Sequence, residues 1–176
     1  MTRQWLDSLK WSEIQELIPI TCVDILPLRL LLGDSNTIEA AGLIFRETPH
    51  QGNRWCLIGG RLGRNESFKE AVSREIYDTL GNELHYTVNE DVQPDFVAEY
   101  FSVHRDNKCF DPRQHAIGLT FCIPMIGEIH PQGEAISFRW FKINQLPTPN
   151  EFGFQQDRIV AACLEKYSCR LNPPSK

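Results

Sequence analysis

The residue types best suited to chemistry gather in one stretch, residues 59–81, which reads GGRLGRNESFKEAVSREIYDTLG. Two glycines open it, and Glu75 and Asp78 follow with an arginine alongside. A glycine-rich loop lets backbone groups approach a metal or a phosphate closely, and a helix holds carboxylates three residues apart on one face. Mg²⁺ prefers hard oxygen ligands and shares them with substrate phosphates. The stretch therefore predicts a place that holds a metal-bound diphosphate.

The elements that must position these side chains are the glycine turn and the helix after it. A short strand over residues 55–58 leads into the glycines. Ser67 and Glu70 have the spacing of a capping box, which predicts that the helix begins there. Apolar residues then recur at helical spacing. Gly81 stands where a left-handed C-cap is expected.

Further periodic segments predict a mixed α+β domain around this turn and helix. Ser12 and Gln15 also have capping-box spacing, so we expect a first helix over residues 12–18 that stops at Pro19. The last element is an amphipathic helix over residues 155–167. The other predicted elements are strands over residues 20–26, 38–46, 96–104, 116–125 and 137–143.

The composition limits the classes of function. A chain of 176 residues with 41% hydrophobic residues fits one domain with a real core. A net charge of −5, without a basic run, argues against a binder of nucleic acid or of anionic membranes. No apolar run is long enough to span a bilayer. The N-terminus lacks the apolar core of a signal peptide, and the six cysteines have no metal-ligand spacing, so we expect a cytoplasmic protein.

The spacing within residues 59–81 resembles the Nudix box, the signature of the Nudix hydrolase superfamily. The residues on its pattern are Gly60, Glu66, Arg74, Glu75, Ile76 and Gly81. The resemblance implies the Nudix fold, an α/β/α sandwich with a central mixed β-sheet and the box as a loop–helix–loop, in which Glu66 and Gly81 are structural. We expect an N-terminal helical extension over residues 1–19, a Nudix domain over residues 20–168 and a flexible tail over residues 169–176.

Thr79 departs from the box, which usually has a second glutamate at this position, and Asp78 replaces the first glutamate with a shorter acid. Asn82 and Ile58 also depart from the usual residues. Threonine keeps an oxygen but no charge, so the implied site holds one Mg²⁺ or Mn²⁺ weakly rather than two or three ions. The implied metal ligands are Glu75, Asp78, Glu134 and a carbonyl of Gly59 or Gly60.

A second resemblance is to the GDP-mannose mannosyl hydrolase branch of the superfamily. Arg46, Arg61 and Arg74 match arginines of that branch, and the forked donors of arginine suit a diphosphate. Asp24 matches an acidic residue that the branch uses towards its nucleotide. These four residues are the implied substrate contacts.

The general base stays open, because the catalytic histidine of that branch falls at Ala135. Glu134, Glu75 or His115 could each serve. Residues 113–115 also form a polar cluster at the start of a strand, where they are expected to line the pocket.

The implied function is cleavage of a nucleoside diphosphate linked to another group, with a nucleotide sugar as the expected substrate and a metal-assisted water as nucleophile. One alternative is a Nudix-fold module that binds nucleotides or regulates without turnover, which Thr79 and Ala135 favour. Another is a different activity on the same fold, such as isomerisation of a small molecule. The apolar N-terminal segment, with Trp5 and Trp11, predicts packing on the domain or on a second subunit. With the resemblance, it leads us to expect a homodimer.

Overall fold

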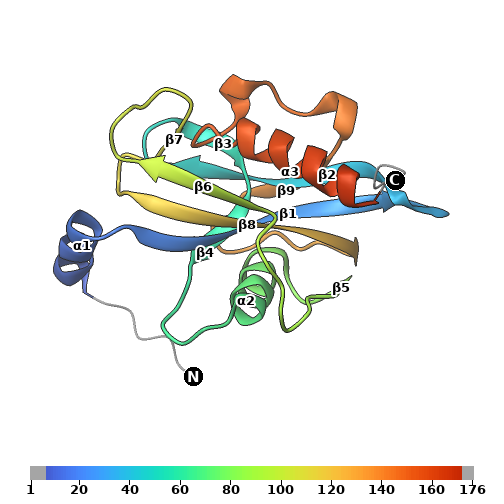
Figure 1. Cartoon of the computed structure of the whole chain (residues 1–176), viewed down its shortest axis with the longest axis horizontal. Helices are drawn as coiled ribbons and strands as arrows, with labels where there is room; N and C mark the ends of the chain where they lie inside the picture. Colours follow the sequence, from blue (N-terminus) through green and yellow to red (C-terminus); the bar gives the residue numbers. More distant parts are fainter. Residues whose placement is uncertain (1–6, 172–176) are drawn as a thin grey trace.

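A mixed β-sheet lies between two helices, as Figure 1 shows for a computed structural model that describes residues 7–171. Helix α2 (Phe68–Leu80) covers one face of the sheet, and α3 (Asp157–Leu171) covers the other. Helix α1 (Ser8–Leu17) stands at one end of the molecule. The predicted sandwich of helices around a mixed sheet is confirmed.

Nine strands make up the sheet within the described residues. Their path runs β3-β2-β1-β8-β6-β7, with β4 paired to β1, β5 to β8 and β9 to β2. Two short 3₁₀ turns, η1 (Ile143–Gln145) and η2 (Pro149–Glu151), connect β9 to α3. The strands are β1 (Ile20–Leu31), β2 (Asp34–Thr48), β3 (Gly52–Cys56), β4 (Ile58–Arg61), β5 (Leu84–Tyr86), β6 (Phe96–Phe101), β7 (Cys109–Phe110), β8 (Ala116–Gly127) and β9 (Ser137–Lys142).

Strand β1 is the hub of the sheet because it pairs with three strands. It runs parallel to β8 along most of its length, and its other edge pairs antiparallel first with β4 and then with β2. The β4 ladder ends at Ile25 and the β2 ladder begins at Leu28. Pro27 lies in the gap between these ladders, where its missing N–H costs no hydrogen bond to either strand. This placement explains why β1 continues past the predicted end at residue 26.

Helix α2 forms as the sequence predicts. The Ser67 hydroxyl accepts from the Glu70 N–H, and the Glu70 carboxylate accepts from the Ser67 N–H at 2.7 Å, so the capping box is confirmed. The buried face includes Val72, Ile76 and Leu80. Gly81 has a positive φ of 88°, but its ψ of −167° lies outside the left-handed helical region. The predicted left-handed cap is therefore wrong in detail, although the position still favours glycine.

Helix α1 begins earlier than predicted. Asp7 is its N-cap and accepts from the Lys10 N–H at 3.0 Å, whereas the Ser12 hydroxyl donates to the carbonyl of Ser8 inside the helix. The predicted start at Ser12 is wrong because the aspartate one turn upstream supplies the cap first. The helix ends before Pro19, as expected. Trp5 and Leu6 lie outside the described residues.

Several other boundaries differ from the predicted ones. Strand β2 starts at Asp34 rather than residue 38, and α3 starts at Asp157 and runs to Leu171. The predicted strand over residues 55–58 is replaced by β3 and β4, and the glycines predicted as a turn lie inside β4. The short strands β5 and β7 were not predicted, since segments of two or three residues carry little periodic signal. Among residues 7–171, no helix is both long and apolar enough to cross a membrane.

Two serines test which capping pattern is real. Ser67→Ala should lower the free energy of unfolding by about 1 kcal/mol, because the Glu70 N–H loses its acceptor. Ser12→Ala is the matched control and should change it by less than about 0.5 kcal/mol, because this side chain caps nothing. Urea unfolding followed by circular dichroism measures both values. Equal losses for the two variants would contradict the assignment.

Candidate active site

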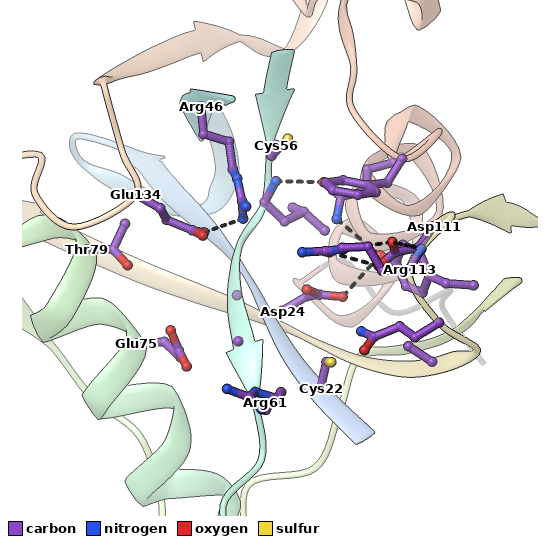
Figure 2. A pocket seen from close by; sticks show the side chains of 18 of the residues that line it. Cys22, Asp24, Arg46, Cys56, Arg61, Glu75, Thr79, Asp111, Arg113 and Glu134 are labelled. Carbon is purple, nitrogen blue, oxygen red and sulfur yellow. Dashed lines mark hydrogen bonds and ion pairs between the residues drawn. The ribbon is translucent and has the colours of Figure 1, made fainter. Parts of the chain in front are cut away.

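A cavity of about 570 Å³ is lined by α2, by strands of the sheet and by the loops next to them. Side chains from β1, β2, β4, α2 and α1 line it, together with loops before β8, before β9 and before α3 (Figure 2). The volume lies in the range of small-molecule sites. The predicted site residues that line it are Asp24, Arg46, Gly59, Gly60, Arg61, Glu75, Asp78 and Glu134.

The two glycines let β4 pass directly against two carboxylates. A Cβ atom on Gly60 would lie 2.1 Å from Oε1 of Glu75, and one on Gly59 would lie 2.4 Å from Oδ1 of Asp24. Any larger residue would displace these acids. The glycines thus allow a close approach of backbone to carboxylate, whereas the sequence predicts a close approach to a metal or phosphate.

Arg74 joins the loop of the box to its helix. Its Nε and Nη2 donate to the two oxygens of Glu66 at 2.6 and 2.9 Å, and Nη2 also donates to the Arg61 carbonyl at 3.1 Å. Its Nη1 pairs with Glu75. The hydrogen bonds to Glu66 are the main reason why the pKa of Arg74 is raised above its ordinary value.

This pairing changes the interpretation of Arg74 and Glu66. Arg74 is not among the residues that line the cavity, so it orients Glu75 rather than meeting a substrate directly. Glu66 also accepts from the Gly63 N–H at 2.7 Å, which fixes the loop as expected of a structural residue. Gly81, at the end of α2, lies away from the cavity lining as well.

Three carboxylates that line the cavity, Asp24, Glu75 and Glu134, repel one another. Burial is the main cause that raises the pKa of Asp24 to about 7; the hydrogen bond from Tyr100 opposes it, and the charges of Glu75 and Glu134 add to it. Burial also raises the pKa of Glu134, with Arg46 lowering it and Glu75 raising it. Such a cluster of like charges is stabilised by a cation.

The oxygen donors in this part of the cavity fit a hard divalent ion. Glu75 is buried and Glu134 is partly exposed, with its Oε1 2.5 Å from Nη1 of Arg46. Asp78 lines the cavity but lies on the exposed side of α2, whereas Thr79 is buried beside Glu134 (Figure 2). The helix therefore offers one buried carboxylate and one buried hydroxyl where the box resemblance implies more acids.

A chain of hydrogen bonds that was not predicted holds Asp24. The Leu57 N–H donates to Oε1 of Gln156 at 2.9 Å, Nε2 of Gln156 donates to the Tyr100 hydroxyl at 3.1 Å, and that hydroxyl donates to Oδ2 of Asp24 at 3.1 Å. All four residues line the cavity or its floor. The order of donors is fixed because the amide oxygen of Gln156 is already used by Leu57.

A strained turn aims Gln156 at this chain. Phe154 and Gln155 both have positive φ angles, 56° and 60°, which residues with a Cβ rarely adopt. The Phe154 N–H donates to Oε1 of Gln51 at 3.1 Å, which helps to hold the turn. The turn also explains why α3 starts two residues later than predicted. Strain of this kind is typical of functional sites.

His115 does not line the cavity. Its ring stacks on Phe101 with centroids 4.8 Å apart, and its Nε2 is buried with no hydrogen-bond partner among the described residues. Its neighbours Arg113 and Gln114 do line the cavity, and Asp111 holds Arg113 through two side-chain hydrogen bonds of 2.9 and 2.8 Å. The geometry therefore favours Glu134 or Glu75 over His115 as the base.

Helix α1 also contributes to the lining, through Trp11 and Gln15. The sequence predicted only that Trp11 would pack on the domain or on a second subunit. Since these residues carry no motif, no sequence signal could have linked them to the cavity.

The chain is similar to one described family and to several solved structures. The sequence matches a family described as "Domain of unknown function (DUF4916)" over residues 1–166. The search of curated proteins gave no match. A solved structure from Jonesia denitrificans, named as a possible asymmetric diadenosine tetraphosphate (Ap4A) hydrolase, is similar with a TM-score of 0.76 and 27% identity, over 91% of this chain and 99% of that one.

Two more distant structures support the same fold. A MutT/Nudix family protein from Enterococcus faecalis has a TM-score of 0.59 and 15% identity, over 97% of this chain and 81% of that one. A Nudix family hydrolase from Clostridium perfringens has a TM-score of 0.61 and 15% identity, over 88% of this chain and 99% of that one. The architecture predicted from the box is thus the Nudix fold of these neighbours.

The raised pKa of Asp24 predicts a specific pH dependence of stability. The carboxyl is protonated in both folded and unfolded chains below about pH 4, and the unfolded chain releases its proton first as the pH rises. Wild-type stability should therefore fall relative to Asp24→Asn between about pH 4 and pH 7, by as much as roughly 4 kcal/mol. The asparagine oxygen can still accept from Tyr100.

Denaturant unfolding at several pH values, with EDTA present, measures this difference. Asp106→Asn, in an exposed loop, controls for the loss of one negative charge. Parallel pH profiles for the wild type and Asp24→Asn would contradict the prediction.

Proposed function

Since the chain belongs to the DUF4916 family and has the Nudix fold, we propose that it is a divalent-metal-dependent hydrolase that cleaves a nucleoside diphosphate linked to another group. The observation that carries the proposal is the composition of one cavity. Carboxylates that suit a metal, Glu75 and Glu134, share it with Arg46 and Arg61, which suit phosphate oxygens. A metal-bound diphosphate needs both kinds of group within reach.

Glu75, Asp78, Glu134 and a carbonyl of Gly59 or Gly60 would hold the ion, Mg²⁺ or Mn²⁺. When bound, this ion supplies Lewis-acid activation of a phosphoryl oxygen and of the attacking water. Arg74 pairs with Glu75 and holds it against β4. Arg46 and Arg61 bind the phosphates and stabilise the negative charge that develops on the leaving group.

Glu134 is the base that the geometry supports best. It lines the cavity, it is partly exposed, and burial raises its pKa, which makes the carboxylate a better proton acceptor. Each acid pairs with an arginine, but Glu75 exposes only 10% of its side chain against 36% for Glu134, so an attacking water reaches Glu134 more readily. In the proposed step, Glu134 takes a proton from water as the oxygen attacks phosphorus or the anomeric carbon. The leaving group departs with the electrons of the broken bond.

A nucleotide sugar is the proposed substrate class. Arg46, Arg61 and Asp24 occupy the pattern of the GDP-mannose mannosyl hydrolase branch, and all three line the cavity. The similarity to the structure from Jonesia denitrificans, named for Ap4A, makes a dinucleoside polyphosphate the second candidate. Both substrates present a diphosphate unit to the same arginines.

The competing function is a module that binds a nucleotide without turnover. Thr79 removes one acid from the box, and Ala135 stands where the branch has its catalytic histidine. Glu75 and its support by Arg74 favour the enzyme, because a binding module does not need an oriented metal-binding carboxylate.

A substrate panel separates these functions. The protein should release phosphate, nucleotide or sugar from a nucleotide sugar or a dinucleoside polyphosphate with Mg²⁺ or Mn²⁺, and EDTA should abolish the release. Glu75→Gln should lower kcat by at least about a hundredfold, because the metal loses its buried ligand. Glu165→Gln, on an exposed position of α3, is the control. Thermal stabilisation by nucleotides without any product would support the binding module instead.

Thr79 offers a second test of the metal site. Thr79→Glu should tighten the binding of Mn²⁺ by about tenfold, because it adds a carboxylate beside Glu134. In Thr79→Gln the new side chain is nearly as large as glutamate but has no charge, so the affinity for Mn²⁺ should stay near the wild-type value. Calorimetric titration with Mn²⁺ measures both. Identical affinities for the two variants would show that Thr79 does not face the metal.

A further inference from the structure

Helix α1 is not held in place by a buried apolar face. None of its residues is buried, and Leu9 and Leu17 expose 83% and 72% of their surface. A helix of ten residues gains little stability from local propensity alone. Trp11 and Ile14 pack partly buried against the hydrophobic core, and beyond that packing the position of the helix depends on a few specific contacts.

Those contacts go to residues of the cavity. The Arg61 guanidinium carbon lies 3.9 Å from the centroid of the Trp11 ring, which is a cation–π stack. One turn further, Nε2 of Gln15 donates to Oε1 of Gln114 at 2.7 Å. All four side chains line the cavity, so α1 docks onto the site itself.

The stack restricts Arg61 in a useful way. A guanidinium that stacks on an aromatic ring uses its flat face, while its N–H groups point outward in its plane, where they match the oxygens of a phosphate. A mobile arginine side chain loses conformational entropy when it binds a phosphate. A side chain that is already stacked on a ring has lost part of that entropy before binding. The ring of Trp11 therefore prepares Arg61 for an anionic ligand.

We propose that Trp11 is a positioning residue for phosphate binding, acting through Arg61, and that α1 is a wall of the substrate site rather than an appendage to the domain. The inference rests on the proposed function, because it takes the ligand of Arg61 to be a phosphate of the nucleoside diphosphate. The family match begins at residue 1, so α1 lies within the matched unit. A nucleobase cannot stack on the face of Trp11 that Arg61 covers, which leaves positioning as its role on that face.

Two substitutions at Trp11 separate stacking from packing. Trp11→Phe keeps an aromatic face and should bind inorganic pyrophosphate and ADP, each with Mg²⁺, within about threefold of wild type. Trp11→Leu keeps an apolar side chain without the aromatic face and should weaken both by about five- to thirtyfold. Leu9→Ala, on the same helix but exposed, should leave both affinities unchanged. Calorimetry measures the affinities, and thermal melting confirms that each variant is folded.

A double-mutant cycle tests whether Trp11 acts through Arg61. In the Arg61→Ala background, Trp11→Leu should cause no further loss of affinity, because the side chain that it positions is gone. A loss of the same size in both backgrounds would overturn the inference. So would equal affinities of the wild type and Trp11→Leu.

The failure of this inference and that of the proposed function give different results. If the wild type binds and hydrolyses phosphate compounds and Trp11→Leu binds them equally well, the positioning role is wrong and the proposed function still holds. A wild-type protein that binds neither pyrophosphate nor ADP nor any member of the substrate panel would remove both. The Arg61 Nε–Hε resonance reports the stack without any ligand, and its ring-current shift should disappear in Trp11→Leu.

Discussion

The close approach of β4 to two acids is the constraint on which the site depends. With no side chains on Gly59 and Gly60, the backbone of β4 lies against Asp24 on β1 and Glu75 on α2. The strand thereby brings together an acid from the sheet and an acid from the helix. Two arginines offset the negative charge nearby, Arg74 by pairing with Glu75 and Arg46 by pairing with Glu134.

Charge compensation is the second feature that organises the cavity. Neighbouring carboxylates raise the pKa of Asp24 and of Glu134, and arginines pair with two of the acids, Arg74 with Glu75 and Arg46 with Glu134. Buried acids of this kind cost stability unless they are paired. The fold accepts that cost in the cavity where, in the proposed function, a cation and a diphosphate bind, a pattern typical of functional sites.

The local part of this arrangement could be predicted from the sequence. The capping box at Ser67, the glycines and the spacing of Glu66, Arg74 and Glu75 are fixed by short-range geometry, which a sequence displays directly. The chain through Tyr100 and Gln156 could not be predicted, because its partners lie 56 to 99 residues apart and neither Tyr100 nor Gln156 belongs to a motif. The early start of α1 was missed because of local rather than distant residues: Asp7 and Ser12 are both possible N-caps within one short segment, and the structure uses Asp7.

These long separations also order events during synthesis and folding. Gln15 meets Gln114 across 99 residues, and Leu57 meets Gln156 across another 99. Contacts between such distant residues form late, because closing a long loop costs entropy before any contact repays it. The box helix can form from its own local signals, but the hydrogen-bond chain to Asp24 is complete only when Gln156, in the turn before α3, reaches Tyr100. A nascent chain that already contains the box, residues 59–81, therefore still lacks residues that complete the cavity, such as Gln156.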